Sequence, residues 1–167
     1  MSASKSLNGS FSYSSNYNYN REDNVISNET IKGGIDYLIT GAYTNGIGAD
    51  NKANLLFHKK YSIGIGATET LDLNGNTLVD IWGETLNFAT VKSLILHNIE
   101  LVSLTGRIIT FTWGGESAII AGGGHRVLTQ TSASGIGSVL NDITLTAGSE
   151  ATDIVVIMIG NDDVAST

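Results

Sequence analysis

Apolar and polar residues alternate along several short stretches of the chain, and these stretches are separated by Gly and Asn residues. Within the segment 107–113, Ile109, Phe111 and Trp113 fall on one side of an extended strand, with threonines on the other side. The segment 153–159 instead contains a continuous apolar run, which is typical of a central strand covered on both sides. Related patterns predict further strands at 35–40, 53–57, 61–63, 94–99, 117–121, 126–131 and 143–146.

These strands predict an all-β protein, built as an antiparallel β-sandwich or jelly roll with an extended N-terminal arm. A helical fold would need amphipathic segments of about ten residues or more, and the sequence has none. Asn74 and Gly75 stand between two apolar segments and predict a β-hairpin over residues 68–79 with a type I′ turn. The segment 88–93 is too short to distinguish the start of a strand from a single helical turn.

A similar glycine phrase occurs three times, as Asn45-Gly-Ile-Gly-Ala49, Ser62-Ile-Gly-Ile-Gly-Ala67 and Ser134-Gly-Ile-Gly-Ser138. The spacing between the phrases is irregular, so they do not mark a solenoid repeat. We interpret them as turns or β-bulges, where the chain needs backbone conformations that glycine adopts easily.

The N-terminal segment 1–30 differs in composition from the rest of the chain. Ser, Asn and Tyr make up 14 of its first 20 residues, and aliphatic residues are too few to form a core. We predict an extended low-complexity arm at 1–30, followed by a single β-sandwich domain at 31–167. Large aromatic residues are enriched at protein interfaces, so the arm is expected to contact a neighbouring subunit through Phe11, Tyr13, Tyr17 and Tyr19. A tail without a role is the alternative.

Charged residues form only 15% of the chain, which leaves much neutral surface for partners and favours assembly over a free monomer. The net charge of −7 opposes general binding to nucleic acids, which requires Lys and Arg to neutralise phosphates. The basic residues all precede residue 127, so the final part of the chain is acidic. There is no cysteine, no signal-peptide pattern and no apolar run of about 20 residues that would predict a membrane helix.

Candidate catalytic and metal-binding residues are few. The histidines His58, His97 and His125 do not occur at the spacing of a metal-binding pair, and we expect structural positions for all three. The glycines of 122–126 could form an anion-binding nest, but no following helix is predicted, so a loop between strands is the preferred interpretation. The spacing of acidic and amide residues in 72–80 does not match a calcium loop.

Two tryptophans raise the question of carbohydrate binding. Trp113 and Glu116 could contact a sugar, but Trp113 lies in an alternating strand and is expected in the core. Trp82 follows the predicted hairpin and is the better candidate for a partly exposed aromatic residue. No catalytic, cofactor-binding or metal-binding residue is predicted, and the chain is not expected to be an enzyme. An enzyme would require distant carboxylates such as Glu69, Glu84 and Glu116 to meet in one cleft.

The run from Ala67 to Leu73, Ala-Thr-x-Thr-Leu-Asp-Leu, precedes a second pattern from Gly83 to Asn98. This second pattern reads Gly-x-Thr-Leu-x-Phe-Ala-x-Val-Lys-x-Leu-x-Leu-x-Asn. Together with Ile143-Thr-Leu-Thr146 and a closing strand at 155–160, it resembles small virion structural proteins of tailed bacteriophages. The resemblance extends over residues 35–160 and does not include the tyrosine-rich arm.

This resemblance implies a β-sandwich cement or decoration protein that binds between subunits of the major capsid protein and stabilises the head. It further implies self-association, with a homotrimer expected. The acidic net charge and the lack of a long apolar run predict no contact with nucleic acid or membrane. The expected location is the outer surface of the capsid, after assembly in the cytoplasm of the host bacterium. A tail or fibre component that binds host surface glycans is the alternative.

Overall fold

The computed structural model describes residues 9–11, 15–21, 29–35, 41–45, 50, 52–80, 83–101, 106–129, 135–136 and 141–162. Every regular element among these residues is a β-strand, which confirms the predicted all-β class. No helix long and apolar enough to cross a membrane occurs in the described ranges.

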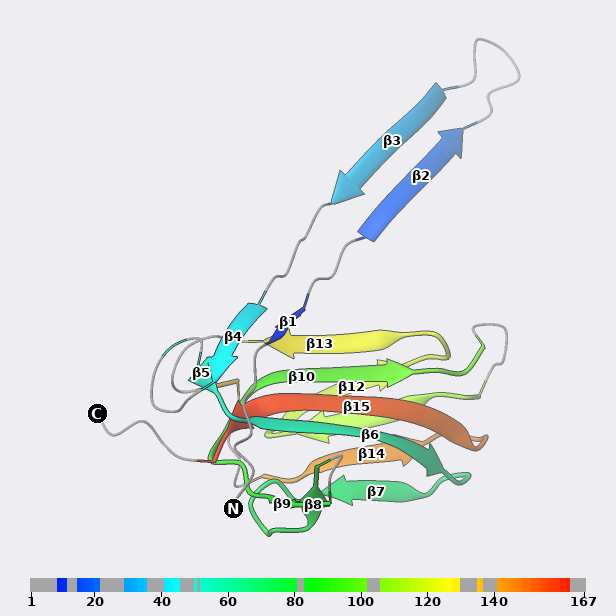
Figure 1. The fold of residues 1–167 in the computed structure, drawn as a ribbon. Helices are drawn as coiled ribbons and strands as arrows, with labels where there is room; N and C mark the ends of the chain where they lie inside the picture. The colour runs from blue at the N-terminus through cyan, green and yellow to red at the C-terminus, as the bar shows by residue number, and fades with distance from the viewer. Residues whose placement is uncertain are drawn as a thin grey trace.

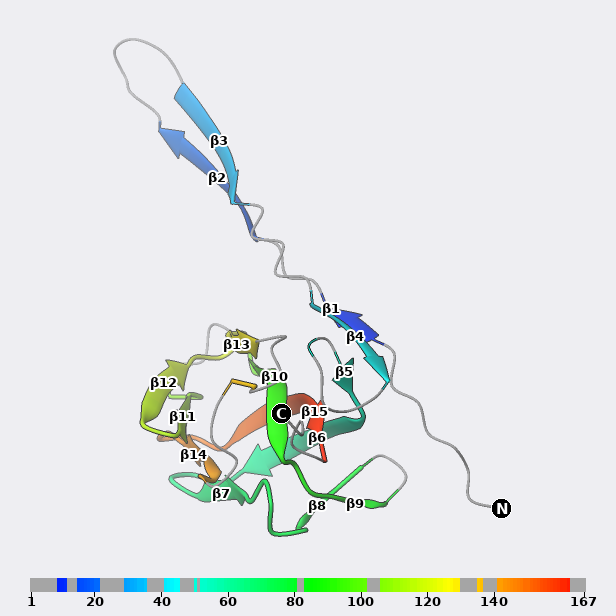
Figure 2. The same ribbon diagram turned by 90° about the vertical axis from the view of Figure 1, so that its left-hand side faces the viewer.

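Two four-stranded antiparallel sheets form the body of the protein (Figures 1 and 2). Sheet one has the order β13-β10-β15-β6, formed by His125–Thr129, Thr90–Asn98, Thr152–Asn161 and Leu55–Ile63. Sheet two has the order β12-β11-β14-β7, formed by Glu116–Ile120, Ile109–Trp113, Ile143–Ala147 and Thr68–Leu71. The two sheets pack face to face, so the predicted antiparallel β-sandwich is confirmed.

The core lies between the sheets and follows from the alternation along each strand. In β11, Ile109, Phe111 and Trp113 are buried while the intervening threonines are partly exposed, as the alternation predicts. The strand β15 also alternates: its inward residues are fully buried, and its outward residues Val155, Ile157 and Ile159 are partly exposed. The prediction that this apolar run is covered on both sides therefore holds only for its inner side within the described part of the molecule.

The predicted Asn-Gly hairpin is wrong. The strand β7 pairs with β14, whereas β8 (Leu78–Val79) pairs with β9 (Thr85–Leu86). The Asp72 carboxylate accepts hydrogen bonds from the backbone amides of Asn74 (3.2 Å) and Gly75 (2.7 Å), and the positive φ of 58° falls on Asn76. This side-chain-capped turn redirects the chain, so the two flanking segments join different partners. The segment 88–93 leads into β10 and does not form a helical turn.

The N-terminal part contains a long, interrupted antiparallel ribbon. The strand β1 (Gly9–Phe11) pairs with β4 (Gly41–Asn45), and β2 (Ser15–Arg21) pairs with β3 (Glu29–Ile35). The strand β4 also pairs in parallel with the short β5 (Lys52–Ala53). The β2–β3 hairpin stands away from the sandwich in both views (Figures 1 and 2). The division into an arm at 1–30 and a domain at 31–167 stays a prediction.

Two of the glycine phrases lie at a turn and beside a bulge. Gly66, with a φ of 62°, lies in the turn between β6 and β7, where the Ala67 amide donates to the Gly64 carbonyl. Gly135, with a φ of 70°, precedes Ile136, whose amide donates to the Val91 carbonyl at 2.8 Å. That carbonyl adjoins the irregularity in β10 between Val91 and Ser93. The central residues of the first phrase lie outside the described residues.

Candidate docking surface

The outer face of sheet one is aliphatic. The ladder registers bring six aliphatic side chains from all four strands onto this face, and all six are partly exposed. We call this set the aliphatic face: Leu56, Ile95, Val127, Val155, Ile157 and Ile159. Figure 1 looks onto this side of the sandwich, and no other described strand crosses its middle.

The outer face of sheet two has the opposite character. Thr110 and Thr112 of β11 stand beside Thr146 and Thr144 of β14. The strand β7 extends both rows with Thr68 and Thr70. The Thr68 hydroxyl is hydrogen-bonded to that of Thr146 at 2.8 Å, and the Thr112 and Thr144 hydroxyls are also bonded to each other. The outer face of sheet two is therefore mainly polar, although β12 adds one exposed apolar side chain, Ile119, beside Thr110.

Imidazole groups border the aliphatic face. His97 and His125 are paired across β10 and β13, with ring centroids 6.4 Å apart in an edge-to-face arrangement. His58 is exposed next to Ile157 on the edge strand β6. Among the described residues, no group of three His, Cys, Asp or Glu side chains could hold a metal ion. The three histidines thus occupy exposed strand positions at the border of this face.

Tyr43 of β4 covers one end of the same face and joins the ribbon to the sandwich. Its buried hydroxyl is hydrogen-bonded to the Ser93 hydroxyl at 2.8 Å and to the Thr129 hydroxyl at 3.3 Å, and it donates to the Lys92 carbonyl at 3.2 Å. Lys92 itself is fully buried. Burial lowers the pKa of its ammonium group, and the nearby Asp50 partly opposes that effect. The sequence interpretation missed both residues, because their contacts join segments about fifty positions apart.

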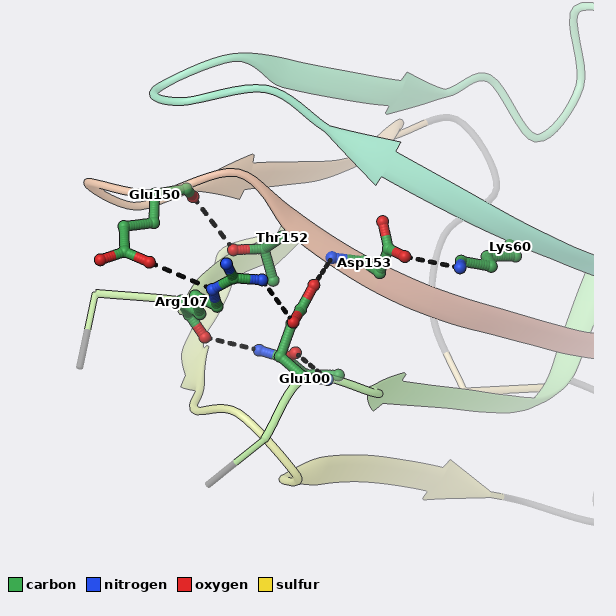
Figure 3. A network of polar contacts seen from close by, with 7 residues as sticks. Lys60, Glu100, Arg107, Glu150, Thr152 and Asp153 are labelled. Carbon is green, nitrogen blue, oxygen red and sulfur yellow. Dashed lines mark hydrogen bonds and ion pairs between the residues drawn. The ribbon is translucent and has the colours of Figure 1, made fainter. Parts of the chain in front are cut away.

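Ionic groups close one end of the sandwich (Figure 3). The Arg107 guanidinium lies 2.6 Å from a Glu100 carboxylate oxygen and 3.1 Å from one of Glu150. The other Glu100 oxygen accepts a hydrogen bond from the Asp153 amide at 3.1 Å. The Lys60 ammonium lies 2.5 Å from the Asp153 carboxylate, and this contact is the main cause that holds the pKa of Asp153 below its ordinary value. These charges link the ends of the two sheets, so their arrangement is structural.

The other chemical candidates are also occupied by internal contacts. Trp113 is in the core, as expected, and its indole N–H donates to the Asn141 carbonyl at 3.1 Å. A depression of about 300 Å³ lies beside it, lined by Trp113, Gly114, Glu116, Leu128, Thr129, Ile136 and Asn141. At its border Glu116 forms an ion pair with Arg126 at 3.2 Å. Trp82 lies outside the described residues.

The described loop at 122–126 gives no site either. In the 122–126 loop, the Gly123 amide donates to the Asn98 carbonyl and the Gly124 amide donates to the Ala121 carbonyl, so these amides are not available to an anion. Of the carboxylates considered for an enzyme, Glu69 lies in β7, Glu84 lies between β8 and β9, and Glu116 lies in β12. The described part of the chain does not assemble them into one group of acidic side chains.

Three of the four residues predicted for the interface lie in described strands of the ribbon. Phe11 lies in β1, and Tyr17 and Tyr19 lie two positions apart in β2, whereas Tyr13 lies outside the described residues. Their interface role stays a prediction.

The aliphatic face was not predicted as a site, although its signal was present: apolar residues occupy both alternating sets of positions in β15. No family model, curated protein or solved structure matches this chain.

Proposed function

We propose that this chain is a non-enzymatic structural protein of a bacteriophage virion, which acts as capsid cement by docking through the aliphatic face of sheet one. The observation that carries the proposal is this face itself. Six partly exposed Ile, Leu and Val side chains share it, and contiguous apolar surface of this kind marks interaction sites. Fully burying one such exposed side chain contributes about 1.5–3 kcal/mol, and a partner that covers the fraction still exposed gains a part of that free energy from each of the six.

The charged groups support a binding role over a catalytic one. The ion pairs of Arg107 and Arg126 join segments of the two sheets to each other. Their carboxylates are therefore held by neighbouring cations. A rigid sandwich closed in this way suits a protein that must present a fixed surface to a repeating lattice. In such a lattice a closed cyclic oligomer, here a homotrimer, is the natural arrangement.

The experiment is addition of the purified chain to capsids of the phage that encodes it, after removal of the native copies. We expect the chain to rebind the capsid lattice in many symmetry-related copies, seen by cryo-electron microscopy, and to raise the temperature at which the heads open. Ile157→Lys on the aliphatic face should abolish rebinding. Thr144→Lys on the opposite sheet is the matched control and should rebind normally.

Other outcomes would contradict the proposal in distinct ways. A few copies at the tail would assign the chain to adsorption or tail assembly, and binding to host glycans would then become the function to test. Equal rebinding by both lysine variants would remove the aliphatic face from the docking surface.

A further inference from the structure

Two histidines lie side by side on the outer face of sheet one. The register of β10 and β13 places His97 directly opposite His125, and both side chains are exposed. Their ring centroids are 6.4 Å apart, and the ring planes are inclined at 84°. The full chain contains three histidines, so this ladder brings together two imidazoles that are far apart in the sequence.

The backbone holds these two side chains in the closer of the two arrangements that an antiparallel ladder allows. The Asn98 amide donates to the Gly124 carbonyl at 2.9 Å, so Asn98 and Gly124 form a hydrogen-bonded pair. Such pairs alternate with non-hydrogen-bonded pairs, in which the Cα atoms are about 4.5 Å apart and the side chains approach more closely. His97 and His125 occupy the adjacent position of the ladder. Both imidazoles are therefore directed toward one point above the sheet.

The surroundings of the pair do not oppose a bound cation. On its other side His97 stands opposite Val155 of β15, whose side chain has no hydrogen-bonding group. The next residue in this row is Lys60 of β6. Its ammonium group lies 2.5 Å from the Asp153 carboxylate, which balances its charge (Figure 3). The positive charge nearest to the pair along this row is thus already neutralised.

The separation of the rings is close to the one that a shared metal ion requires. Neutral imidazole is a preferred ligand of Zn²⁺, Cu²⁺ and Ni²⁺. With zinc–nitrogen distances of about 2.0–2.1 Å, two imidazoles on one ion have their ring centroids about 5–6 Å apart. The observed 6.4 Å needs only a small rotation of two exposed side chains to reach this range. No movement of the backbone is required.

We propose that His97 and His125 together bind one divalent transition-metal ion of the zinc type. The described residues bring no third His, Cys, Asp or Glu side chain into this group, so water fills the remaining coordination positions of the ion, as in open zinc sites. Both ligands lie on the outer face of sheet one, and the ion is therefore accessible from solvent. This site goes beyond the proposed function and does not depend on it.

The test is a calorimetric titration of the untagged full-length chain with zinc near neutral pH. The chain has no cysteine, so no thiolate competes for the ion. We expect one saturable site per chain, with an affinity in the micromolar range because only two protein ligands hold the ion. His97→Gln and His125→Gln should each lose this site. His58→Gln is the matched control, since His58 is also exposed on sheet one, and it should bind zinc as the unmodified chain does.

A second measurement uses the unmodified chain and needs no variant. In nuclear magnetic resonance spectra, zinc should shift the imidazole signals of His97 and His125 and leave those of His58 unchanged. Magnesium, which prefers oxygen ligands, should shift none of them. Lowering the pH from about 7 to about 5 should release the zinc, because protons compete with the metal for the imidazole nitrogens.

Three results would overturn the inference. The first is no zinc binding by the unmodified chain at concentrations up to the millimolar range. The second is a zinc site that keeps its affinity in both His97→Gln and His125→Gln, which would place the ion elsewhere on the chain. The third is an equal shift of all three imidazole signals, which would indicate separate weak contacts in place of a shared ion. Each titration uses the free chain, so the outcome is independent of whether the chain binds capsids.

Discussion

Tyr61 links packing to electrostatics at the open edge between β6 and β7. Its ring is buried against Phe57, with the centroids 6.5 Å apart, and the Lys59 ammonium lies 4.6 Å from the ring centroid. Burial raises the pKa of the Tyr61 phenol to about 12, and the Glu69 carboxylate adds to the shift. Lys59 projects inward from an edge strand, a placement that discourages pairing with foreign strands.

The raised pKa predicts a loss of stability in alkali. The unfolded chain releases this proton near pH 10 and the folded chain near pH 12. The contribution of Tyr61 is therefore complete below pH 10 and is lost as the pH rises to 12. We expect Tyr61→Phe to reduce the fall in unfolding free energy between these pH values by about 2 kcal/mol. Urea unfolding of the wild-type protein and the variant between pH 10 and pH 12 measures this difference. If the unfolding free energies of the two proteins fell in parallel, the raised pKa of Tyr61 would be contradicted.

For single residues, the sequence predicts those positions that strand alternation determines. It does not predict the positions that depend on contacts between distant segments. The clean alternation of its strand predicts Trp113 in the core, and the structure confirms it. The Asn74-Gly75 hairpin prediction is wrong because the Asp72 carboxylate accepts hydrogen bonds from the Asn74 and Gly75 amides and the positive φ falls on Asn76, so a different turn forms. The anchoring contact of Tyr43 with Ser93 carries no local pattern, so no reading of the sequence alone could have found it.

At the scale of strands, Asn98 is the clearest link between the sheets. It ends β10 in sheet one, and its buried side-chain amide donates to the Arg107 carbonyl at 2.9 Å and to the Ile120 carbonyl at 3.0 Å. Both acceptors belong to the segments that start β11 and end β12 in sheet two. One side chain thus fixes the relative position of three strand ends.

Removing this amide should be costly. Asn98→Ala leaves two carbonyl groups without their donor in the interior, and we expect a loss of about 3 kcal/mol in unfolding free energy. The exposed Asn87→Ala serves as the control and should change stability by less than about 0.5 kcal/mol. Chemical unfolding measures the unfolding free energies of the two variants. Equal values would show that contacts other than those of Asn98 align the sheets.

The bulge of β10 provides a second element-scale prediction. A Cβ atom added at Gly135 would lie 2.5 Å from the Val91 carbonyl oxygen, whereas one at Gly66 would meet nothing within 4 Å. Both glycines have positive φ, so Gly66→Ala should cost about 1–2 kcal/mol and Gly135→Ala roughly twice as much. Thermal unfolding compares the stability losses of the two variants. Similar losses would mean that the bulge relaxes freely around the added methyl group.

At the scale of the whole molecule, the sandwich presents two outer faces of different chemistry, threonine on sheet two and aliphatic on sheet one. The apolar run of β15 predicted cover on both sides of this strand, and the described part of one copy covers only the inner side. The sequence could thus indicate that the outer side needs cover. It could not indicate the occupant, because periodicity reports burial and not the identity of the partner.

The contrast between the faces predicts dye binding by the native protein. At dilution, the chain should enhance the fluorescence of anilinonaphthalene sulfonate, which reports exposed apolar surface. The double variant Ile95→Thr with Ile157→Thr should lose most of this enhancement, while Thr110→Val with Thr144→Val should retain it. No enhancement by the unmodified chain would mean that the aliphatic face is already covered in the isolated molecule.

The position of β15 also governs how the molecule forms. This strand follows all the other described strands in the chain, yet it lies between β10 and β6 and completes both of their ladders. Pairing between segments so distant along a chain makes folding slow, because much chain entropy is lost before the contacts form. Until β15 arrives, β6 and β10 expose their aliphatic sides in the crowded cell. The stage before β15 pairs is therefore the one at which the folding chain is most open to aggregation.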